Sequence, residues 1–416
     1  MTETGSSRDG SAVFGPARLG PLTLRNRVIK SATFEGMTRG GLVSDALVEF
    51  HRRMAAGGVG MTTLAYVSVS RDGRTYRHQL WLREDAVAGL RRLTGAVHAE
   101  GALAAVQLGH AGYLATKAAT GTRPVGPSRV FNPAGLAYSR AAGAGDLDRI
   151  AADYARAARL AVDAGFDALE IHLGHGYLLS QFLSPFTNRR RDAYGGDVAG
   201  RAAFPRRVLR EVRAAVASAG GAGAVAVYAK LNMEDGFAGG LRPADGIEAA
   251  RMLQADGAVD ALELTAGFTS RTPMYLMRGE VPLAEMVSRE RSRLRRAGLR
   301  VAGRRLMRAY PFEEAFLLPL ARQFREAVTL PLILLGGITR LETMERAVAE
   351  GFEFVALGRA LLRETDLIRR MQAGTATRSL CVPCNKCVAQ MEAGGTRCVF
   401  VPEAEWVTAG AEGGAG

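Results

Sequence analysis

The sequence predicts one large α/β domain, a (β/α)8 TIM barrel, followed by a short cysteine-rich C-terminal extension. The first observation is that strand-like apolar segments recur along the 416 residues, each followed by a helical pattern. The second is that there are eight such units in one run, which favours a closed parallel barrel. A doubly wound sheet is the alternative, but it would need a Gly-rich turn after the first strand. Ser31 to Phe34 contains none.

The expected strands differ in length but share an apolar core bounded by turn-forming residues. In chain order they are 28–34, 59–69, 103–108, 168–173, 225–231, 261–265, 331–335 and 354–357. Between them, Asp146 is a candidate N-cap for the helix that begins near Leu147. After Pro311, apolar residues at helical spacing predict a helix from Phe312 to Phe324.

Several stretches fall outside the repeat. Residues 14–24 predict a short hairpin that closes the bottom of the barrel, and the long segments 109–145 and 267–308 predict lids or substrate walls. We expect the barrel to span residues 14–370 and the cysteine-rich segment residues 371–403. Flexible tails are expected at 1–13 and 404–416.

Composition limits the function classes. The formal net charge is +13, which raises the question of nucleic acid, but the cations are nearly all arginines scattered over helices. The densest run, 289–308, predicts a solvated helix face or a lid; a site for a polyanion or for an anionic substrate such as an acyl-CoA is the alternative. No apolar run approaches the roughly 20 residues of a membrane span, and the polar start has no signal segment. A cytoplasmic protein without nucleic-acid or membrane partners is expected.

The tract 167–178 is the most informative part of the chain. Leu169, Ile171 and Leu173 alternate with Ala168, Glu170 and His172, so the apolar set should face the helices and the other set the barrel interior. His172, His175 and Tyr177 then fall where the strand ends, which is where barrels place catalytic groups. Such donors can bind a developing oxyanion and deliver a proton.

Polar residues also end other predicted strands. Gln107 offers a donor and an acceptor to a ring with C=O and N–H edges, and Lys230 adds a fixed cation; Thr33 and Glu263 complete the set. Glycine pairs or Gly-Arg end the last two strands, where barrels commonly bind phosphate: Gly336, Gly337, Gly358 and Arg359.

Longer motifs carry a resemblance to a known family. They are Arg25-Asn26-Arg27-Val28, the run from Gln107 to Gly112, and the block from Glu170 to Arg201. On these motifs the chain resembles the Old Yellow Enzyme family of FMN-dependent oxidoreductases over roughly residues 14–370.

The resemblance implies an FMN cofactor reduced by NADH or NADPH, and reduction, or the reverse formation, of a C=C bond conjugated to a carbonyl. It implies that His172 and His175 bind the carbonyl oxygen of a small unsaturated substrate and that Tyr177 donates the proton. The implied FMN contacts are Ser31, Ala32, Thr33, Gln107, Lys230, Gly336, Gly337, Gly358 and Arg359. Phe34 stands where relatives often have Thr or Cys.

All four cysteines, Cys381, Cys384, Cys387 and Cys398, fall in one segment with C-x2-C-x2-C-x10-C spacing. Larger relatives resembling dienoyl-CoA reductase and trimethylamine dehydrogenase carry a 4Fe–4S cluster on a similar run. Four thiolates suit such a cluster, and they also suit zinc; unmetallated thiols are the third alternative. A cluster would imply an electron-transfer partner, and self-association into a homo-oligomer is a further expectation.

Two other functions are compatible with the resemblance. One is oxidative C–N cleavage of an amine, as in trimethylamine dehydrogenase, although a pair of histidines suits an oxyanion better than an amine. The other is a metal-stapled barrel that binds a ligand without turnover, which would have no need for His172, His175, Tyr177 and Gln107 together.

Overall fold

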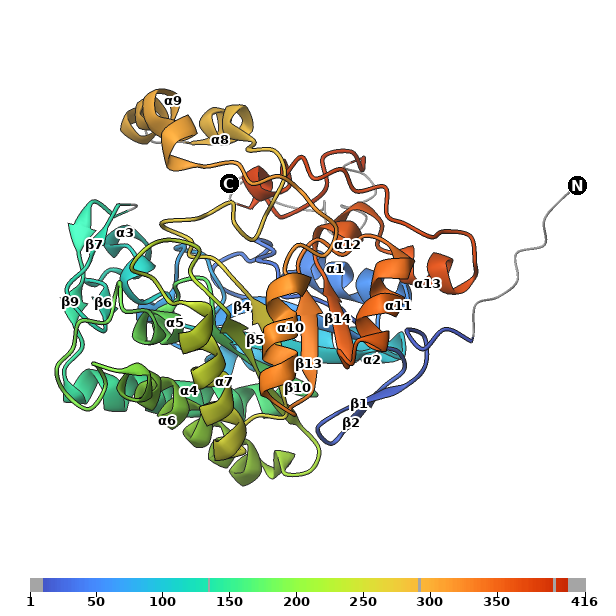
Figure 1. Ribbon diagram of the computed structural model, residues 1–416, viewed down its shortest axis with the longest axis horizontal. Coiled ribbons are helices and arrows are strands. Elements are labelled where there is room, and N and C mark those ends of the chain that lie inside the picture. The colour runs from blue at the N-terminus through green and yellow to red at the C-terminus, as the bar shows by residue number, and fades with distance from the viewer. Residues whose placement is uncertain (1–9, 134, 291–292, 392–393, 403–416) are drawn as a thin grey trace, which may run out of the picture.

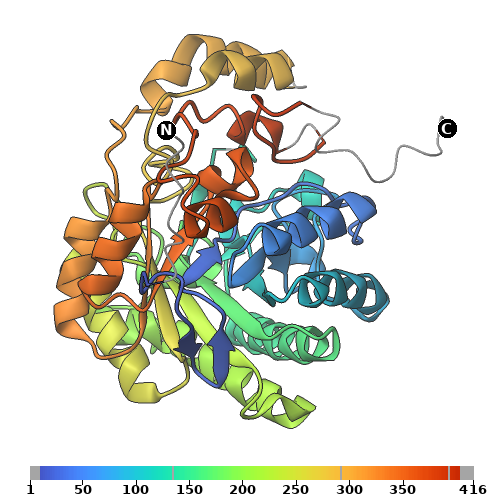
Figure 2. The ribbon, with the colours of Figure 1, turned by 90° about the vertical axis from the view of Figure 1, so that its right-hand side faces the viewer.

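The computed structural model describes residues 10–133, 135–290, 293–391 and 394–402. Eight parallel strands close into a barrel, as predicted, and helices surround it (Figures 1 and 2). In order around the barrel the strands are β3 (Val28–Lys30), β4 (Met61–Ser68), β5 (Leu103–Gly109), β10 (Ala168–Leu173), β11 (Ala226–Asn232), β12 (Ala261–Thr265), β13 (Leu332–Leu335) and β14 (Phe354–Leu357). Three of them, β10, β12 and β14, have the predicted bounds.

Helices that connect the strands, or follow the last strand, cover the outside of the barrel. These are α1 (Asp45–Ala56), α2 (Val87–Ala99), α4 (Ala144–Asp163), α6 (Val198–Val216), α7 (Pro243–Asp256), α10 (Leu318–Ala327), α11 (Leu341–Ala349), α12 (Arg359–Arg363) and α13 (Leu367–Gln372). Leu169, Ile171 and Leu173 belong to the core between strands and helices, whereas Ala168 belongs to a separate interior cluster. The alternation predicted for 168–173 is therefore confirmed.

The two ends of the barrel differ. At one end the hairpin of β1 (Ala17–Leu19) and β2 (Leu22–Leu24) packs Ala17, Leu19 and Leu24 against interior strand residues, and so closes the bottom as predicted. Above the other end lie α8 (Leu283–Arg289) and α9 (Arg293–Leu306), beside the C-terminal segment (Figures 1 and 2). The segment 109–145 at this end contains α3 (Lys117–Thr120) and four two-residue strands: β6 (Val125–Gly126), β7 (Phe131–Asn132), β8 (Ala137–Tyr138) and β9 (Arg140–Ala141).

Two predicted helix starts need correction. Asp146 is not the N-cap of α4: the helix begins at Ala144, and Asp146 accepts a hydrogen bond from the Gly143 N–H at 2.9 Å, from inside the first turn. The helix expected from Phe312 begins only at Leu318, because Ala315 adopts a left-handed φ of 53°. The Ala315 N–H instead donates to the Gly337 carbonyl at 3.1 Å.

Other segments complete the description. The remaining short helices are α5 (Leu178–Leu183), η1 (Arg71–Gly73), η2 (Glu84–Ala86), η3 (Gly112–Leu114), η4 (Ala217–Gly221) and η5 (Val388–Gln390). No helix within the described residues is both long and apolar enough to span a bilayer. Val13, placed in the N-terminal tail by the sequence analysis, is fully buried, and its carbonyl accepts from the Arg27 N–H. Residues 1–9 and 404–416 lie outside the described residues.

Candidate active site

A cavity of about 410 Å³ opens at the end of the barrel where the strands finish. Every catalytic and FMN-binding residue predicted from the sequence lines it: Ser31, Ala32, Thr33, Gln107, His172, His175, Tyr177, Lys230, Gly336, Gly337, Gly358 and Arg359. These residues come from six different strand ends, so the closed barrel brings them together. The volume is within the usual range for a cofactor or ligand site.

A buried ionic network lies beneath this cavity. Lys230 Nζ is 3.0 Å from Glu170 Oε1 and 3.0 Å from Glu263 Oε1, and all three side chains are at most 1% exposed. Burial opposes the charge of Lys230, but the two carboxylates outweigh it and raise its pKa. Burial raises the pKa of Glu263 to about 7, and the Lys230 charge only partly opposes this shift. The Gln107 amide nitrogen also donates to Glu170, so its carbonyl oxygen is suited to accept from a ring N–H.

The two histidines and Tyr177 form one aromatic group. The His172 ring centroid lies 5.1 Å from that of His175 and 4.8 Å from that of Tyr177. The Gly174 N–H donates to His172 Nδ1 at 3.3 Å. Because Nδ1 accepts, the proton of a neutral His172 is on Nε2, which can donate to a ligand. His175 Nε2 is 2.7 Å from the Thr265 hydroxyl oxygen.

Both imidazoles are neutral near pH 7. Burial, the neighbouring His175 and Lys230 lower the pKa of His172 well below its usual value. Burial and Lys230 lower the pKa of His175 to about 3. Burial also raises the pKa of Tyr177 to about 12. The site therefore presents neutral N–H and O–H donors, which can polarise an oxygen without fixing a counter-ion there.

Local structure holds Tyr177 in place. It is the N-cap residue of α5; its carbonyl accepts from the Gln181 N–H at 2.7 Å, and the next N–H, of Leu178, donates to the His110 carbonyl at 2.9 Å. Gly176 has a φ of 76°, and a Cβ there would come within 2.7 Å of the Phe268 ring. The turn between His175 and Tyr177 consequently needs glycine.

A sequence profile of the NADH:flavin oxidoreductase / NADH oxidase family matches residues 12–267. The chain belongs to this family. It is 52% identical over 388 residues to the 4,4'-dithiodibutanoate disulfide reductase of Rhodococcus erythropolis, covering 93% of this chain and 94% of that protein. It is 31% identical over 379 residues to the NADH oxidase of Thermoanaerobacter brockii, covering 90% of this chain but 52% of that protein. The chain thus spans nearly all of the first relative and about half of the second.

Solved structures share the fold. The Old Yellow Enzyme homologue from Zymomonas mobilis superposes with a TM-score of 0.69 at 24% identity, over 90% of this chain and 96% of that one. A 2-naphthoyl-CoA reductase complex superposes with a TM-score of 0.80 at 23% identity, over 95% of this chain and 58% of that one. The family match, together with relatives that are an NADH oxidase and NADPH dehydrogenases, identifies this chain as an FMN-dependent NAD(P)H oxidoreductase.

The residues around the cavity fit the FMN that the family implies. Thr33 Oγ1 is buried and has no partner among the described residues, so a bound group could satisfy it. Gly336 and Gly337 have φ values of 112° and 73°; added Cβ atoms would come within 2.7 Å of Leu317 and 2.6 Å of Phe316. These glycines allow the backbone after β13 to face the cavity. Arg359 lines it too, but its guanidinium also donates to the Arg278 carbonyl at 3.0 Å and to Asn385 Oδ1.

The four cysteines converge on one small pocket beside Arg359, and Cys381 and Cys387 also line the main cavity. Burial raises the pKa of Cys381 to about 11 and that of Cys387 to about 12. Within the described part of the chain, no group of three or more His, Cys, Asp or Glu side chains is placed to hold a metal ion. The donor set suits a metal cluster, but a metal site is not shown.

Sequence reasoning missed several cavity residues. Met274, Met277, Met286, Met307 and Phe312 form an apolar wall contributed by the 267–308 segment and the turn that follows it. Tyr66, near the end of β4, lies beside Tyr177, with the two ring centroids 4.9 Å apart. The place of Tyr66 near a strand end was the sequence signal that could have identified it as a cavity residue. Its hydrogen-bond partners, however, come from a loop that shows no periodic pattern.

Proposed function

We propose that this chain reduces a C=C bond conjugated to a carbonyl, using electrons from NAD(P)H. The observation that carries the proposal is the convergence of His172, His175 and Tyr177 in one cavity with Gln107 and Lys230. Two neutral imidazoles beside a protonated phenol suit a reaction in which negative charge develops on a carbonyl oxygen while a neighbouring carbon needs a proton.

The histidines bind and polarise the substrate. His172 Nε2–H and the imidazole of His175 donate to the carbonyl oxygen, which lowers the energy of the enolate-like state. Because the pKa values of both histidines are lowered, both rings stay neutral. Each ring can therefore donate a hydrogen bond to the carbonyl oxygen, and neither takes up the proton that the substrate carbon receives. FMN, when bound, supplies the hydride. Tyr177 then gives its phenolic proton to the α-carbon.

The same proposal assigns the FMN contacts. Gln107 and Lys230 would hold the ring edge, with Ser31, Ala32 and Thr33 along it. The backbone at Gly336, Gly337 and Gly358, with Arg359, would hold the phosphate. The Thr33 hydroxyl, which has no partner in the part of the chain that the structure describes, and the tight glycines after β13 support this assignment.

The decisive experiment measures NADH- or NADPH-dependent reduction of 2-cyclohexen-1-one, with the saturated ketone quantified as product. His172→Ala/His175→Ala should lose both this activity and the absorbance change that phenol binding causes in the flavin. Undiminished phenol binding would refute the oxyanion role. Amine oxidation by C–N cleavage, with no enone reduction, would support the trimethylamine dehydrogenase alternative.

A second candidate is reduction of an organic disulfide, favoured by the 52% identity to the 4,4'-dithiodibutanoate disulfide reductase. In this reaction the hydride that reduced FMN would supply adds to one sulfur, which becomes a thiol, while the S–S bond breaks and the other sulfur leaves as a thiolate, so no carbon is protonated. The two functions therefore differ in their need for Tyr177. Tyr177→Phe should slow enone reduction much more than disulfide reduction, measured with the same reductant.

We further propose a 4Fe–4S cluster on Cys381, Cys384, Cys387 and Cys398, with zinc as the alternative. Support comes from the convergence of the four thiols and from the partial burial of Cys381 and Cys387, which raises the pKa of both thiols and makes their uncompensated thiolates costly. Such a cluster would exchange single electrons with a protein partner. A cytoplasmic location and self-association complete the proposal, and the segment 371–403 would form the metal-binding unit beside the barrel.

A further inference from the structure

The apolar wall of the cavity is attached to the cysteine segment through one buried amide. Met277 belongs to this wall, and its carbonyl accepts a hydrogen bond from Asn385 Nδ2 at 2.6 Å. The same nitrogen donates to the Glu280 carbonyl at 2.8 Å. Asn385 lies within the run of cysteines and is only 1% exposed. Its side chain therefore holds both ends of the stretch 277–280, which we call the wall segment.

Backbone contacts strengthen this attachment. The Glu280 N–H donates to the Pro383 carbonyl at 2.9 Å, and the Gly279 N–H donates to the Tyr310 carbonyl at 2.8 Å. Gly279 has a φ of 129°, and an added Cβ would collide with the Pro383 carbonyl oxygen. The wall segment thus lies directly against the cysteine segment, and this close approach requires glycine.

The amide of Asn385 also contacts the arginine of the proposed phosphate site. Arg359 Nη1 donates to Asn385 Oδ1 and, at 3.0 Å, to the Arg278 carbonyl of the wall segment. Arg359 begins α12 and lines the cavity. Both bonds use a single nitrogen, and a guanidinium has five N–H donors, so donors remain for a phosphate. Asn385 therefore joins the wall through its nitrogen to the cofactor side through its oxygen.

The backbone of Asn385 explains why this residue type stands here. Its φ is 57°, in the left-handed region that asparagine tolerates better than most residues and that glycine adopts freely. The Asn385 carbonyl accepts from the Val388 N–H at 2.9 Å, which closes the turn. Because backbone bonds hold this turn, the side chain can be removed by substitution with glycine without changing the path of the chain.

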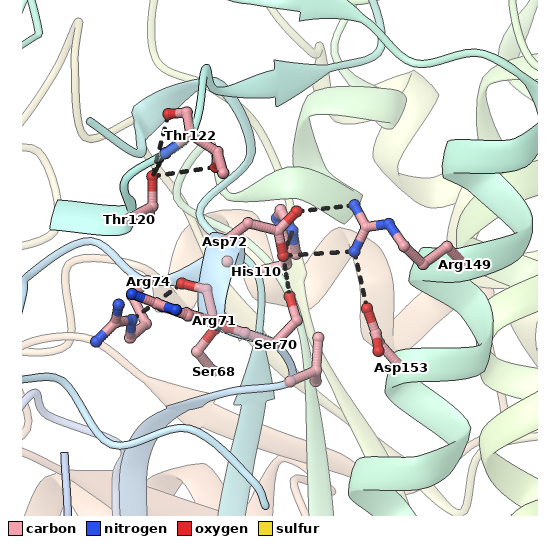
Figure 3. A network of polar contacts seen from close by, with 12 residues as sticks. Ser68, Ser70, Arg71, Asp72, Arg74, His110, Thr120, Thr122, Arg149 and Asp153 are labelled. Atoms are coloured by element: carbon pink, nitrogen blue, oxygen red, sulfur yellow. Dashed lines mark hydrogen bonds and ion pairs between the residues drawn. The ribbon is translucent and has the colours of Figure 1, made fainter. Parts of the chain in front are cut away.

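Another loop beside the cavity is fixed in a different way (Figure 3). Asp72 accepts from Ser70 at 2.6 Å and from Arg149 of α4 at 2.8 Å, so the loop that carries the cavity residue Tyr76 is tied to a helix of the barrel. The bonds of the wall segment described above run mainly to the cysteine segment and to Arg359. The place of the apolar wall consequently depends on the C-terminal segment.

From these contacts we propose that Asn385 is a positioning residue for substrate binding. It holds Met277 and the apolar wall at a fixed place relative to Arg359, and thereby relative to the proposed phosphate site. The side chains of the wall are those of methionines and a phenylalanine, so the wall suits an enone with an apolar substituent. The inference rests on the proposed enone reduction, and Asn385 acts through Met277 and Arg359 rather than on the substrate itself.

Two substitutions separate the two contacts. Asn385→Gly removes both, whereas Asn385→Asp keeps an acceptor for Arg359 but has no N–H for the Met277 and Glu280 carbonyls. In protein saturated with FMN, both should raise KM for benzylideneacetone, an enone with a phenyl substituent, by about tenfold, the effect of losing roughly one hydrogen bond. The kcat should stay within about twofold, because the wall contributes binding that is equal in the ground and transition states. Both variants should keep the parent's metal content, since no cysteine is changed.

A second readout needs no turnover. Hydrogen exchange followed by mass spectrometry reports on the N–H groups of Gly279 and Glu280 in the holoenzyme, and both should exchange about tenfold faster in the two variants. Asn26→Asp is the matched control. Asn26 is also a buried amide, and it donates to the Gly58 carbonyl at 2.7 Å at the other end of the barrel. This control should leave both KM and the exchange of the wall segment at the parent values.

The outcomes distinguish the inference from the function on which it rests. If Asn385→Gly raises KM but Asn385→Asp does not, the effect passes through Arg359 and the wall has no part in it. Faster exchange with an unchanged KM, or a raised KM with unchanged exchange, would likewise overturn the positioning role. If the parent enzyme reduces no enone at all, the proposed function is wrong and the substrate role falls with it, whereas the exchange rates still report whether Asn385 holds the wall segment.

Discussion

Lys230 Nζ lies 3.0 Å from Glu263 Oε1 at the floor of the cavity, where neither side chain is more than 1% exposed. Glu170 makes a second contact with Lys230, also at 3.0 Å. Two carboxylates thus share one ammonium out of contact with bulk water. Burial raises the pKa of Glu263 to about 7, Lys230 opposes this rise, and the neighbouring Glu170 charge adds to it. Removing the lysine would leave the carboxylates uncompensated in a low-dielectric site.

Lys230→Met should therefore destabilise the protein by about 3 to 5 kcal/mol, the usual cost of breaking a buried ion pair from one side. Urea unfolding with FMN in excess measures the change. Lys386→Met is the matched control, because Lys386 forms a pair of similar length, 2.9 Å, with Glu285 at the surface. The control should change stability much less. Equal effects of the two substitutions would show that losing Lys230 does not leave costly, uncompensated carboxylates in the buried network.

Tyr177→Phe separates the two halves of the proposed reaction. Loss of the proton donor should slow flavin reoxidation by enone by about 100-fold or more, while reduction of the flavin by NAD(P)H stays within a factor of two. Stopped-flow absorbance follows each half separately. Tyr154→Phe is the matched control: Tyr154 is buried in α4, and its hydroxyl has no partner among the described residues. If both halves slow equally in Tyr177→Phe, the residue serves binding or folding instead.

The barrel and the members of its cavity were predictable because both follow from short-range patterns. Alternation at Leu169, Ile171 and Leu173 indicates which side of a strand faces the helices. Once the strands are parallel and closed, residues at their ends must meet at one rim. This is why Gln107, His172 and Lys230, far apart in sequence, could be placed together.

What the sequence could not predict are contacts between loops. Thr75 follows β4 with no periodicity that points to its hydrogen bond with Tyr66, and that contact depends on how Asp72 and Gln79 hold its loop. Likewise, nothing in the spacing indicates that Arg359, expected at a phosphate, also donates to Asn385 in the cysteine segment. The late start of α10 at Leu318 depends on one left-handed residue, Ala315, which local propensity does not reveal.

Stability should depend on pH through His172. Its pKa is lowered well below the usual value in the folded state, whereas in the unfolded chain it is about 6.5. Below pH 6.5 the unfolded state binds a proton that the folded state does not, so stability falls as pH decreases. His172→Asn should remove up to about 1.4 kcal/mol per pH unit from this slope between pH 6 and 4.5. Denaturant unfolding at several pH values measures it, and the two slopes should coincide between pH 7.5 and 8.5. Parallel curves throughout would show that folded His172 titrates normally.

The cysteine segment, for which we propose a 4Fe–4S cluster, can be tested by its metal content. Protein purified without oxygen should contain about four irons per chain and show a broad absorbance shoulder beside the flavin bands. Cys384→Ser should lose that iron but keep FMN, since Cys384 does not line the main cavity. Metal analysis and flavin quantification on one sample check both points. Four irons retained in Cys384→Ser would remove this residue from the ligand set. Zinc in place of iron would give the segment a structural role only, and the reductase would then depend on NAD(P)H alone as its electron donor.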